Sequence, residues 1–479
     1  MMRRLFLSTI CLGSLVVLTA QAPVALAAAS LTVDTFEDTF DGSCADGDCS
    51  VRDAVAAVDD GGTVRLPPGF FALNLSGAGP DAGDIDLGRP VTIVGIGETG
   101  TFLDASGLGD RVFDVTADAT LNHLTLLNGA SVGTGGLVRA REGHLELRRV
   151  TMFGGIARDG GAIAVAETAS ASIDRSWIFE NVANDRGGGL FVRGSATLRR
   201  STLSDDRSEG GGGGIFVGPF GAVSLSNSTL SNNVAARGGG IRAIGDIELL
   251  SSTVAVNRAD VGGGILLSDT SVSSVANTVF DRNQATDHGP LCVRRLTSDG
   301  HNVSDLGGCG FTGPGDIAGV DPGLGALRQH GGPTPTHALR DDSPAIGRGG
   351  VCPPTDQRGA PRSDCDSGAY ELVLCLGRRV TIVGTPGPDD LSGGLQRDVF
   401  LGLGGDDVFQ GSLDVDRACG GKGNDHLIGG PGDDLLAGNG GRDLLVGEGG
   451  DDLLIGGPGS DVCRGGTGQD VFRRCETVS

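Results

Sequence analysis

The sequence predicts an all-β chain of 479 residues that forms two successive solenoids. Three observations support this prediction. Glycine is abundant, with 86 residues, and each interior glycine costs an α-helix about 0.5–1 kcal/mol relative to alanine. The middle of the chain repeats with a period of 24 to 27 residues, and the C-terminal fifth repeats every nine residues. Such self-similarity is the signature of repeat architectures.

The N-terminus has the features of an export signal. Residues 1–28 begin with a basic stretch, continue with an apolar run over 5–20 and end near the small-residue sequence ALAAAS. The apolar run is short for a membrane anchor, and no polar stop follows it. We therefore expect Sec-type secretion to the extracellular space, with or without association with the cell surface, and no membrane span after the signal is removed.

The 25-residue units are typical of coils in a parallel β-solenoid. Glycine blocks such as GGAIAV and GGGILL lead into short apolar strands. One coil cannot bury its apolar face alone, so coils stack with strands about 4.8 Å apart. Six anchor positions mark the units: Thr151, Trp177, Thr202, Thr229, Thr253 and Thr278. We assign 29–288 to this solenoid with an N-terminal cap at 31–66, 289–372 to a closing cap segment, and 375–479 to the second solenoid.

Two sets of polar residues keep a fixed distance from the anchors. Four residues past an anchor stand Asn181, Asp206, Asn233 and Asn257. We expect them to form a ladder that satisfies backbone groups at a turn. Two residues before an anchor stand His123, Arg149, Arg175 and Arg200. This row is either solvated surface or the edge of a groove for an acidic polymer.

Three segments of the first solenoid resemble known bacterial proteins. The sequence GGAI at 160–163 is similar to the repeats of polymorphic outer membrane proteins. The sequence CSVRDAV at 49–55 resembles the CSLREAI element of secreted β-helix proteins. The stretch that ends at Glu371 resembles the closing segment of choice-of-anchor proteins. Together these resemblances cover 31–371 and imply a right-handed parallel β-helix with an N-terminal cap. They carry over no catalytic residue.

The C-terminal repeat consists of ten unbroken nonads over 384–473. Every first position is glycine, and every eighth position is apolar or cysteine. Every sixth position is aspartate: Asp389, Asp398, Asp407, Asp416, Asp425, Asp434, Asp443, Asp452, Asp461 and Asp470. The fourth position is glycine except at Gln396 and Asp414: Gly387, Gly405, Gly423, Gly432, Gly441, Gly450, Gly459 and Gly468.

This pattern places carboxylates where they need a cation. If two nonads complete one turn, aspartates 18 residues apart stack about 4.8 Å apart. Two bare carboxylates at that distance repel by about 1 kcal/mol in water and more near a protein surface. Calcium takes six to eight oxygens in flexible geometry, whereas magnesium demands a tight octahedron. We therefore expect several Ca²⁺ ions, bound by the sixth-position aspartates and by carbonyls of the second and fourth positions.

The nonads resemble the RTX, or haemolysin-type, repeat GGxGxDxUx. The resemblance implies a calcium-binding parallel β-roll whose folding is coupled to ion binding. Gln396 and Asp414 put the second and fourth sites in doubt. A disordered acidic tail is the alternative, but it does not explain the unbroken apolar eighth position. An N-terminal signal is unusual for RTX proteins, which leave through a dedicated exporter.

Ten cysteines remain after the signal, an even number that favours disulfides in an exported chain. Proximity in sequence suggests Cys44–Cys49, Cys292–Cys309, Cys352–Cys365 and Cys463–Cys475, which leaves Cys375 with Cys419. Zinc is the rival interpretation, although no CxxC pair or Cys/His cluster has ligand spacing.

Composition narrows the function without fixing it. A net charge of −23 argues against nucleic acid as a partner. We expect a secreted calcium-binding protein without enzymatic activity, which acts at the cell surface or in the extracellular matrix in adhesion and binds an acidic polysaccharide or a surface ligand. The alternative is a polysaccharide lyase or epimerase, because alginate C5-epimerases combine a β-helix with RTX modules. Their Asp-Pro-His motif is missing, and the single tyrosine, Tyr370, lies in the closing stretch.

Overall fold

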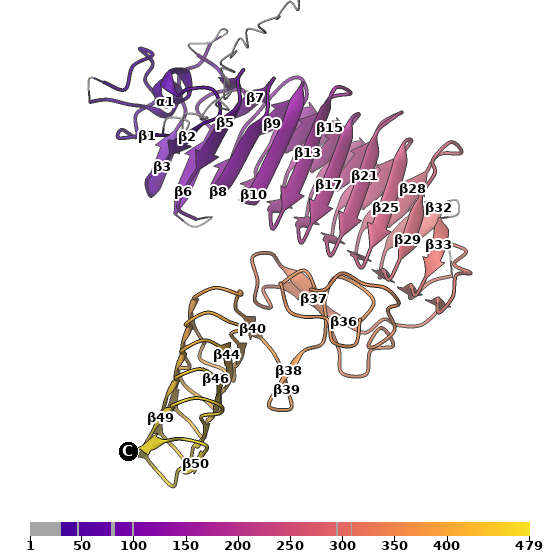
Figure 1. The fold of residues 1–479 in the computed structure, drawn as a ribbon. Coiled ribbons are helices and arrows are strands. Elements are labelled where there is room, and N and C mark those ends of the chain that lie inside the picture. The colour runs from indigo at the N-terminus through magenta and orange to yellow at the C-terminus, as the bar shows by residue number, and fades with distance from the viewer. Residues whose placement is uncertain (1–29, 46, 78–81, 98–99, 294–295, 308) are drawn as a thin grey trace, which may run out of the picture.

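The computed structural model describes residues 30–479 except 46, 78–81, 98–99, 294–295 and 308. The predicted signal at 1–28 lies outside these residues. The described chain forms a parallel β-helix (residues 30–318), a docked segment (319–372) and a parallel β-roll (382–479), as Figure 1 shows. The fold class predicted from the repeats is confirmed.

A regular coil of the β-helix contains four strands. In one coil these are β13 (Ala169–Asp174), β14 (Trp177–Phe179), β15 (Val182–Arg186) and β16 (Leu190–Val192). Each strand pairs in parallel with its counterpart in the neighbouring coil, so the strands form four rows along the β-helix.

The rows are as follows. Row 1 contains β1 (Ser30–Thr32), β2 (Gly62–Arg65), β5 (Val91–Val94), β8 (Ala119–Leu127), β10 (Gly143–Phe153), β13, β17 (Ser195–Arg199), β21 (Ala222–Ser226), β25 (Asp246–Leu250), β29 (Ser274–Ala276) and β33 (Thr297–Gly300). Row 2 contains β3 (Gly69–Ala72), β6 (Thr101–Asp104), the second halves of β8 and β10, β14, β18 (Thr202–Ser204), β22 (Thr229–Ser231), β26 (Thr253–Ala255), β30 (Val279–Asp281), β34 (Val303–Ser304) and β35 (Ile317–Ala318). Row 3 contains β11 (Ile156–Asp159), β15, β19 (Arg207–Gly211), β23 (Val234–Arg237), β27 (Arg258–Val261) and β31 (Gln284–His288). Row 4 contains β4 (Ile85–Leu87), β7 (Phe113–Val115), β9 (Val138–Ala140), β12 (Ile163–Val165), β16, β20 (Ile215–Val217), β24 (Ile241–Ala243), β28 (Ile265–Leu267) and β32 (Cys292–Val293).

Apolar side chains of all coils meet in one continuous core inside the β-helix. A single register shows the principle, because its residues pair from coil to coil and are all buried: Leu147, Ile173, Leu198, Leu225 and Leu249. Residues on either side of them along each strand point outward. The stacking of coils therefore follows directly from the period in the sequence.

The predicted ladder is present at the turn between rows 2 and 3. The amide of Asn181 donates to Asp206 Oδ1 at 2.9 Å, and the amides of Asn233 and Asn257 continue the row at 3.0 Å. Asn283 extends it by one coil. The anchor set contains one wrong member, because Thr253 pairs with Val279 and not with Thr278. The Thr278 hydroxyl instead accepts from the Ser252 backbone, in a second ladder of small hydroxyl side chains.

A short helix covers the first coil, within the range expected to form the N-terminal cap. Helix α1 (Val51–Ala57) begins at Ser50, which accepts from the Asp53 backbone, while the Asp53 carboxylate accepts from Ser50 in return. This reciprocal cap satisfies two amide groups that the first turn leaves unpaired. Val51 and Ala54 belong to the β-helix core.

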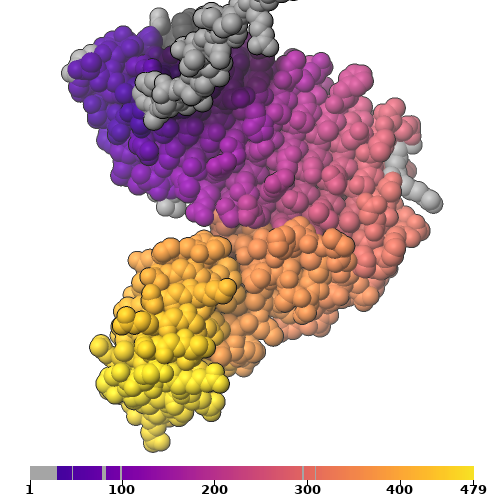
Figure 2. Space-filling model, viewed as in Figure 1, coloured from indigo at the N-terminus to yellow at the C-terminus, as the bar shows by residue number. Residues whose placement is uncertain are grey.

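The segment expected to close the last coil lies elsewhere. The coil pattern continues to β35, past residue 288, and Phe311 packs against Phe280 of the core at that end. Residues 319–372 instead run along the outer face of row 2 (Figures 1 and 2). This docked segment contains one antiparallel pair, β36 (Leu324–Arg328) and β37 (Thr336–Leu339).

Single buried side chains attach the docked segment to row 2. The Gln357 amide donates to Thr202 Oγ1 at 2.7 Å, and its oxygen accepts from Thr229 Oγ1 at 2.7 Å. Thr253 Oγ1 accepts from the Ala369 backbone at 3.1 Å. The anchor threonines of these coils are therefore outward-facing residues that the docked segment covers.

The roll follows a hairpin of β38 (Leu374–Cys375) and β39 (Arg378–Arg379). One of its sheets contains β40 (Ile382–Val383), β42 (Val399–Leu401), β44 (Arg417–Lys422), β46 (Leu435–Gly440), β48 (Leu453–Ile455) and β50 (Val471–Arg473). The other contains β41 (Asp390–Ser392), β43 (Val408–Gln410), β45 (His426–Pro431), β47 (Leu444–Gly449), β49 (Val462–Thr467) and β51 (Thr477–Val478). Within the described residues, no helix is long and apolar enough to cross a membrane.

Five disulfides join the ten cysteines in the pairs that sequence proximity suggested: Cys44–Cys49, Cys292–Cys309, Cys352–Cys365, Cys375–Cys419 and Cys463–Cys475. The pair Cys375–Cys419 ties the hairpin before the roll to β44, and Cys463–Cys475 lies in the last turns.

Candidate metal centre

The roll has a core one residue wide. Each nonad ends in a strand whose eighth residue points inward, and five of these strands continue into the first three positions of the next nonad. Eight of these residues are completely or almost completely buried in one cluster: Phe400, Phe409, Ala418, Leu427, Leu436, Leu445, Leu454 and Cys463. Leu391 and Phe472 pack against its two ends. Residues 18 apart pair directly, as Leu427 does with Leu445. Two nonads therefore make one turn.

The sixth-position aspartates form a regular row along each edge of the roll. In the eight from Asp407 to Asp470, Oδ1 accepts from the backbone N–H of the aspartate one turn earlier, for example Asp443 Oδ1 from Asp425 at 2.9 Å and Asp452 Oδ1 from Asp434 at 2.8 Å. In the first turn, Asp389 accepts from the Thr385 backbone and Asp398 from the Gly394 backbone. Seven of the ten are buried: Asp407, Asp416, Asp425, Asp434, Asp443, Asp452 and Asp461. Asp389, Asp398 and Asp470, at the ends, are partly exposed.

The second oxygen of most of these carboxylates is buried without a hydrogen-bond partner. This is so for Oδ2 of Asp407, Asp425, Asp434, Asp443, Asp452 and Asp461. A buried charged oxygen without a partner costs several kcal/mol unless it is neutralised. A row of such oxygens at one-turn spacing fits a divalent cation, and calcium accepts this all-oxygen donor set.

The pKa values of the carboxyl groups also reflect their burial without a partner for the second oxygen. Burial, reinforced by neighbouring aspartates, raises the pKa of Asp407 and Asp434 to about 7. The same causes raise the pKa of Asp443 and Asp452 to about 6. Without a cation, these groups lower the cost of burial by taking up protons.

Glycine at the first and fourth positions leaves the space that a cation site needs. A Cβ on Gly420 would lie 2.2 Å from Asp425 Oδ2, so no side chain fits between the turn and the carboxylate. Gly423 has φ of +125° and its Cα approaches the Gly405 carbonyl, from which an added Cβ would be 2.0 Å away. The fourth-position carbonyls therefore stack one above the next, as additional oxygen ligands for a cation along the edge.

The two exceptions at the fourth position have different surroundings. Asp414 adopts a left-handed conformation with φ of +78°, and its carbonyl approaches Gly432 as a glycine carbonyl would. The row of stacked backbone carbonyls thus continues through this nonad. Gln396 is exposed, and beside it Arg397 lies 3.9 Å from the Asp414 carboxylate.

Sequence reasoning missed one acidic residue of the row. Glu476 Oε2 accepts from the Asp461 backbone at 2.6 Å, where the next sixth-position aspartate would be expected. It lies 15 residues after Asp461, because the final turn carrying the Cys463–Cys475 disulfide is shorter than a regular turn. The acidic residue next to the last cysteine was the only signal in the sequence.

Outside the roll, the described ranges bring no three His, Cys, Asp or Glu side chains together as a metal-binding group. Nor does such a group of three side chains form in the roll itself, so ions there would take much of their coordination from turn carbonyls. The predicted ligands thus lie in two rows, with one carboxylate from each turn on each edge.

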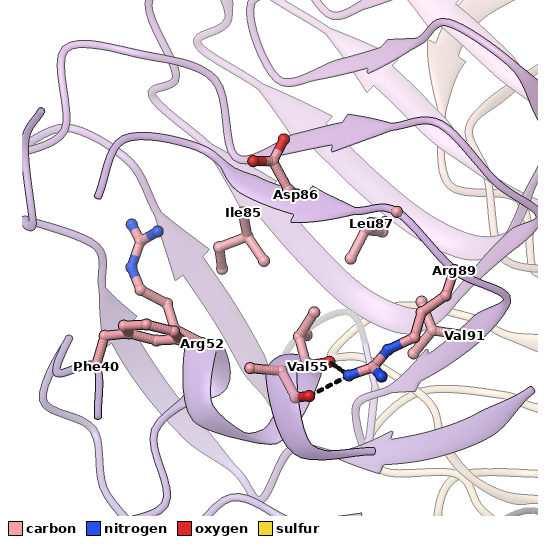
Figure 3. A pocket seen from close by; sticks show the side chains of 10 residues that line it. Phe40, Arg52, Val55, Ile85, Asp86, Leu87, Arg89 and Val91 are labelled. Atoms are coloured by element: carbon pink, nitrogen blue, oxygen red, sulfur yellow. Dashed lines mark hydrogen bonds between the residues drawn. The ribbon is translucent and has the colours of Figure 1, made fainter. Parts of the chain in front are cut away.

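A pocket of about 270 Å³ lies beneath α1 (Figure 3). Its wall is largely apolar, with Ile85, Leu87 and Val91 among the lining residues. Arg89 donates to the Val55 carbonyl at 2.9 Å at the end of the helix, and Asp86 points away from the pocket. Arg89 therefore stabilises the end of the helix, and the charged groups do not converge on a ligand.

Comparisons with known proteins agree with the roll. The family model of the RTX calcium-binding nonapeptide repeat (4 copies) matches residues 383–418, 410–445 and 437–472. No curated protein is significantly similar in sequence. Among solved structures, the chain is similar to the pectate lyase Pel9A, with 14% identity over 72% of this chain and 97% of that chain and a TM-score of 0.40. It is also similar to the PL6 family alginate lyase AlyGC, with 10% identity over 86% of this chain and 74% of that chain and a TM-score of 0.27.

The fold and the repeat matches define the class of protein. The chain is a parallel β-helix protein with a C-terminal block of RTX calcium-binding repeats. The repeats are the part of the chain to which calcium binding is assigned.

Proposed function

We propose that this protein is exported through the signal at residues 1–28 and acts outside the cell as a calcium-dependent adhesion or matrix protein without catalytic activity. Calcium binding by the ten nonads folds the roll. Five disulfides support export, since such bonds persist in oxidising compartments.

One observation supports the calcium role above the others: the row of buried carboxylate oxygens without hydrogen-bond partners. The roll offers about one inward side chain per nonad, so its apolar core is too thin to outweigh that many buried charges. Ion binding supplies the missing stabilisation, and the folding of the roll and its loading with calcium become one event. A chain exported with an unfolded roll would become fully folded only where calcium is abundant.

The test is a calcium titration of the full chain by calorimetry and circular dichroism. We expect saturable binding of several ions with a gain of β-structure, reversed by a chelator. Asp434→Asn should remove binding capacity, because this buried carboxylate has one unpaired oxygen. Asp433→Asn is the matched control, since the neighbouring carboxylate is exposed and accepts from the Asp451 backbone at 2.9 Å. An unchanged spectrum in chelator and in millimolar calcium would refute the proposal.

Polysaccharide cleavage is the second candidate function. It is supported by a cleft that contains Arg149, whose side chain forms no ion pair in the described part of the chain. An arginine can hold the carboxylate of an acidic sugar by charge-assisted hydrogen bonds. Incubation with alginate, pectin and glycosaminoglycans should give no unsaturated products if the protein only binds. Their appearance would replace adhesion by lyase chemistry and leave the calcium role untouched.

A further inference from the structure

A cleft of about 290 Å³ lies where the β-helix, the docked segment and the roll meet. Arg149 and Arg175 line it from two adjacent coils, Arg358 from the docked segment, and Thr385 and Asp389 from the first nonad. It is thus built from residues more than 200 positions apart. It brings two arginines of the β-helix row together with the first nonad of the roll.

The backbone holds the cleft arginines in place. Arg149 and Arg175 have φ of +50° and +49°, the same left-handed conformation on consecutive coils. Strands of adjacent coils lie about 4.8 Å apart, so the two side chains leave the same edge one rung apart. Two arginines are held there although a left-handed conformation is unfavourable for residues with a side chain.

The charge of the cleft is not balanced within the described chain. Arg149 has no ion-pair partner there, and Arg175 lies 3.7 Å from Asp174, which is held more closely by Arg200 at 2.7 Å. Arg358 is different, because it is buried and paired with Asp356 at 2.8 Å. In a protein with a net charge of −23, two neighbouring cations with so little compensation favour an anionic ligand.

Aromatic side chains continue the same outer face. Trp177 and Phe179 follow Arg175 on β14, and Phe153 on β10 pairs with Phe179. Their rings stack, with centroids 5.1 Å apart for Phe153–Phe179 and 4.1 Å for Trp177–Phe179. All three side chains are partly exposed, whereas the docked segment covers row 2 from Thr202 onward. Aromatic faces beside cations suit a sugar ring that carries a carboxylate.

Asp389 connects the cleft to the row of sixth-position aspartates. It is the first residue of that row, it lines the same cleft as the arginines, and its carboxylate accepts from the backbone and the hydroxyl of Thr385. As a bare carboxylate it repels an acidic ligand, and a calcium ion held by this residue and by turn carbonyls removes that repulsion. The roll would then order the cleft wall and reverse its local charge in one step.

We propose that this cleft and the aromatic strip beside it bind an acidic polysaccharide of the uronate class, and that calcium loading of the first turn of the roll permits this binding. The inference rests on the proposed adhesion function and names its ligand and its regulation.

The test measures binding of fluorescent oligogalacturonate and oligo-alginate to the full chain, in calcium and in chelator. Dextran serves as the neutral sugar and poly-glutamate as an acidic polymer without sugar rings. We expect both uronates to bind only in calcium, and neither control to compete. The double variant Arg149→Ala/Arg175→Ala should bind them about tenfold more weakly or worse, because each arginine supplies a hydrogen bond to a charged group.

Two matched controls isolate the cleft. Arg207→Ala/Arg258→Ala removes the same charge from exposed row 3 positions and should bind as the wild type does. In calcium, Asp389→Asn should bind uronate more weakly than the wild type, because the first turn no longer holds its ion, whereas Asp390→Asn, whose exposed side chain does not line the cleft, should bind uronate as the wild type does.

Each outcome separates this inference from the proposed function. An equal loss of uronate binding in the two double-arginine variants would overturn a specific sugar site. Binding of poly-glutamate as tight as that of the uronates would overturn it as well. Unchanged uronate binding by Asp389→Asn in calcium would overturn the coupling. Failure of all uronates to bind while calorimetry still detects calcium would end this inference alone, whereas failure of calcium to bind would end the proposed function as well.

Discussion

At the scale of single residues, Asp206 is the exception in a ladder of asparagines. Its Oδ1 accepts from Asn181, but its Oδ2 occupies the place of an amide nitrogen and has no partner. In the other coils, that nitrogen donates to the next asparagine oxygen. Complete burial holds the pKa of Asp206 well above its usual value of 3.8. Only the neutral acid can donate the missing hydrogen bond to Asn233.

Asp206→Asn should therefore stabilise the protein at neutral pH, by about 1–3 kcal/mol in the free energy of unfolding. Because the folded-state pKa is raised, the stability that depends on the neutral acid is complete below the unfolded-state pKa of about 3.8 and is lost as pH rises through the folded-state pKa. The wild type should thus lose stability relative to the variant as pH rises. Denaturant unfolding at several pH values, with the partly exposed neighbour Asp205→Asn as control, measures this difference.

At the scale of elements, two adjacent glycines of the roll have different structural roles. Gly441 has φ of +145°, and a Cβ there would lie 1.7 Å from the Gly423 carbonyl oxygen. A Cβ on Gly440 would be 3.7 Å from its nearest neighbour, an ordinary contact. The turn thus tolerates a side chain at the third position and excludes one at the fourth.

Gly441→Ala should destabilise the calcium-loaded roll by about 1–3 kcal/mol through backbone strain alone, and it should weaken calcium binding by displacing a stacked carbonyl. Gly440→Ala should change the free energy of unfolding of the roll by less than about 1 kcal/mol, roughly the propensity effect of one glycine. Calcium titration and thermal unfolding of both variants check this. Equal effects of the two substitutions would contradict the assignment of the fourth position.

The elements that repeat could be predicted from the sequence, because a period fixes which residues become neighbours. The ladder from Asn181 to Asn257 and the inward eighth position of each nonad follow from spacing alone. The position of the docked segment does not. Its contact between Gln357 and Thr202 joins residues 155 positions apart and depends on one side chain. The cleft was equally hidden, although its arginines were recognised as a row, because its other wall belongs to a different repeat.

At the scale of the whole molecule, Gln357 links the docked segment to the β-helix. It is fully buried, donates to Thr202 and Thr334, and accepts from Thr229. Gln357→Ala leaves several buried polar atoms without partners and should cost about 2–4 kcal/mol. Hydrogen exchange of residues 319–372 should accelerate, while exposed Gln284→Ala should leave it unchanged. Uniform acceleration over the β-helix would show that the segment and the coils unfold together.

The docked segment also bears on how such a protein can change length during evolution. It forms hydrogen bonds with Thr202, Thr229 and Thr253 on three consecutive coils, so the spacing of its contacts must match the spacing of these coils. Duplication or loss of a coil within this span would shift every later contact by one rung. In the described chain, no hydrogen bond joins the docked segment to a coil before that of Thr202, but Arg149 and Arg175 line the same cleft as its Arg358. Gene rearrangements that lengthen or shorten the protein are therefore expected in the coils before Arg149.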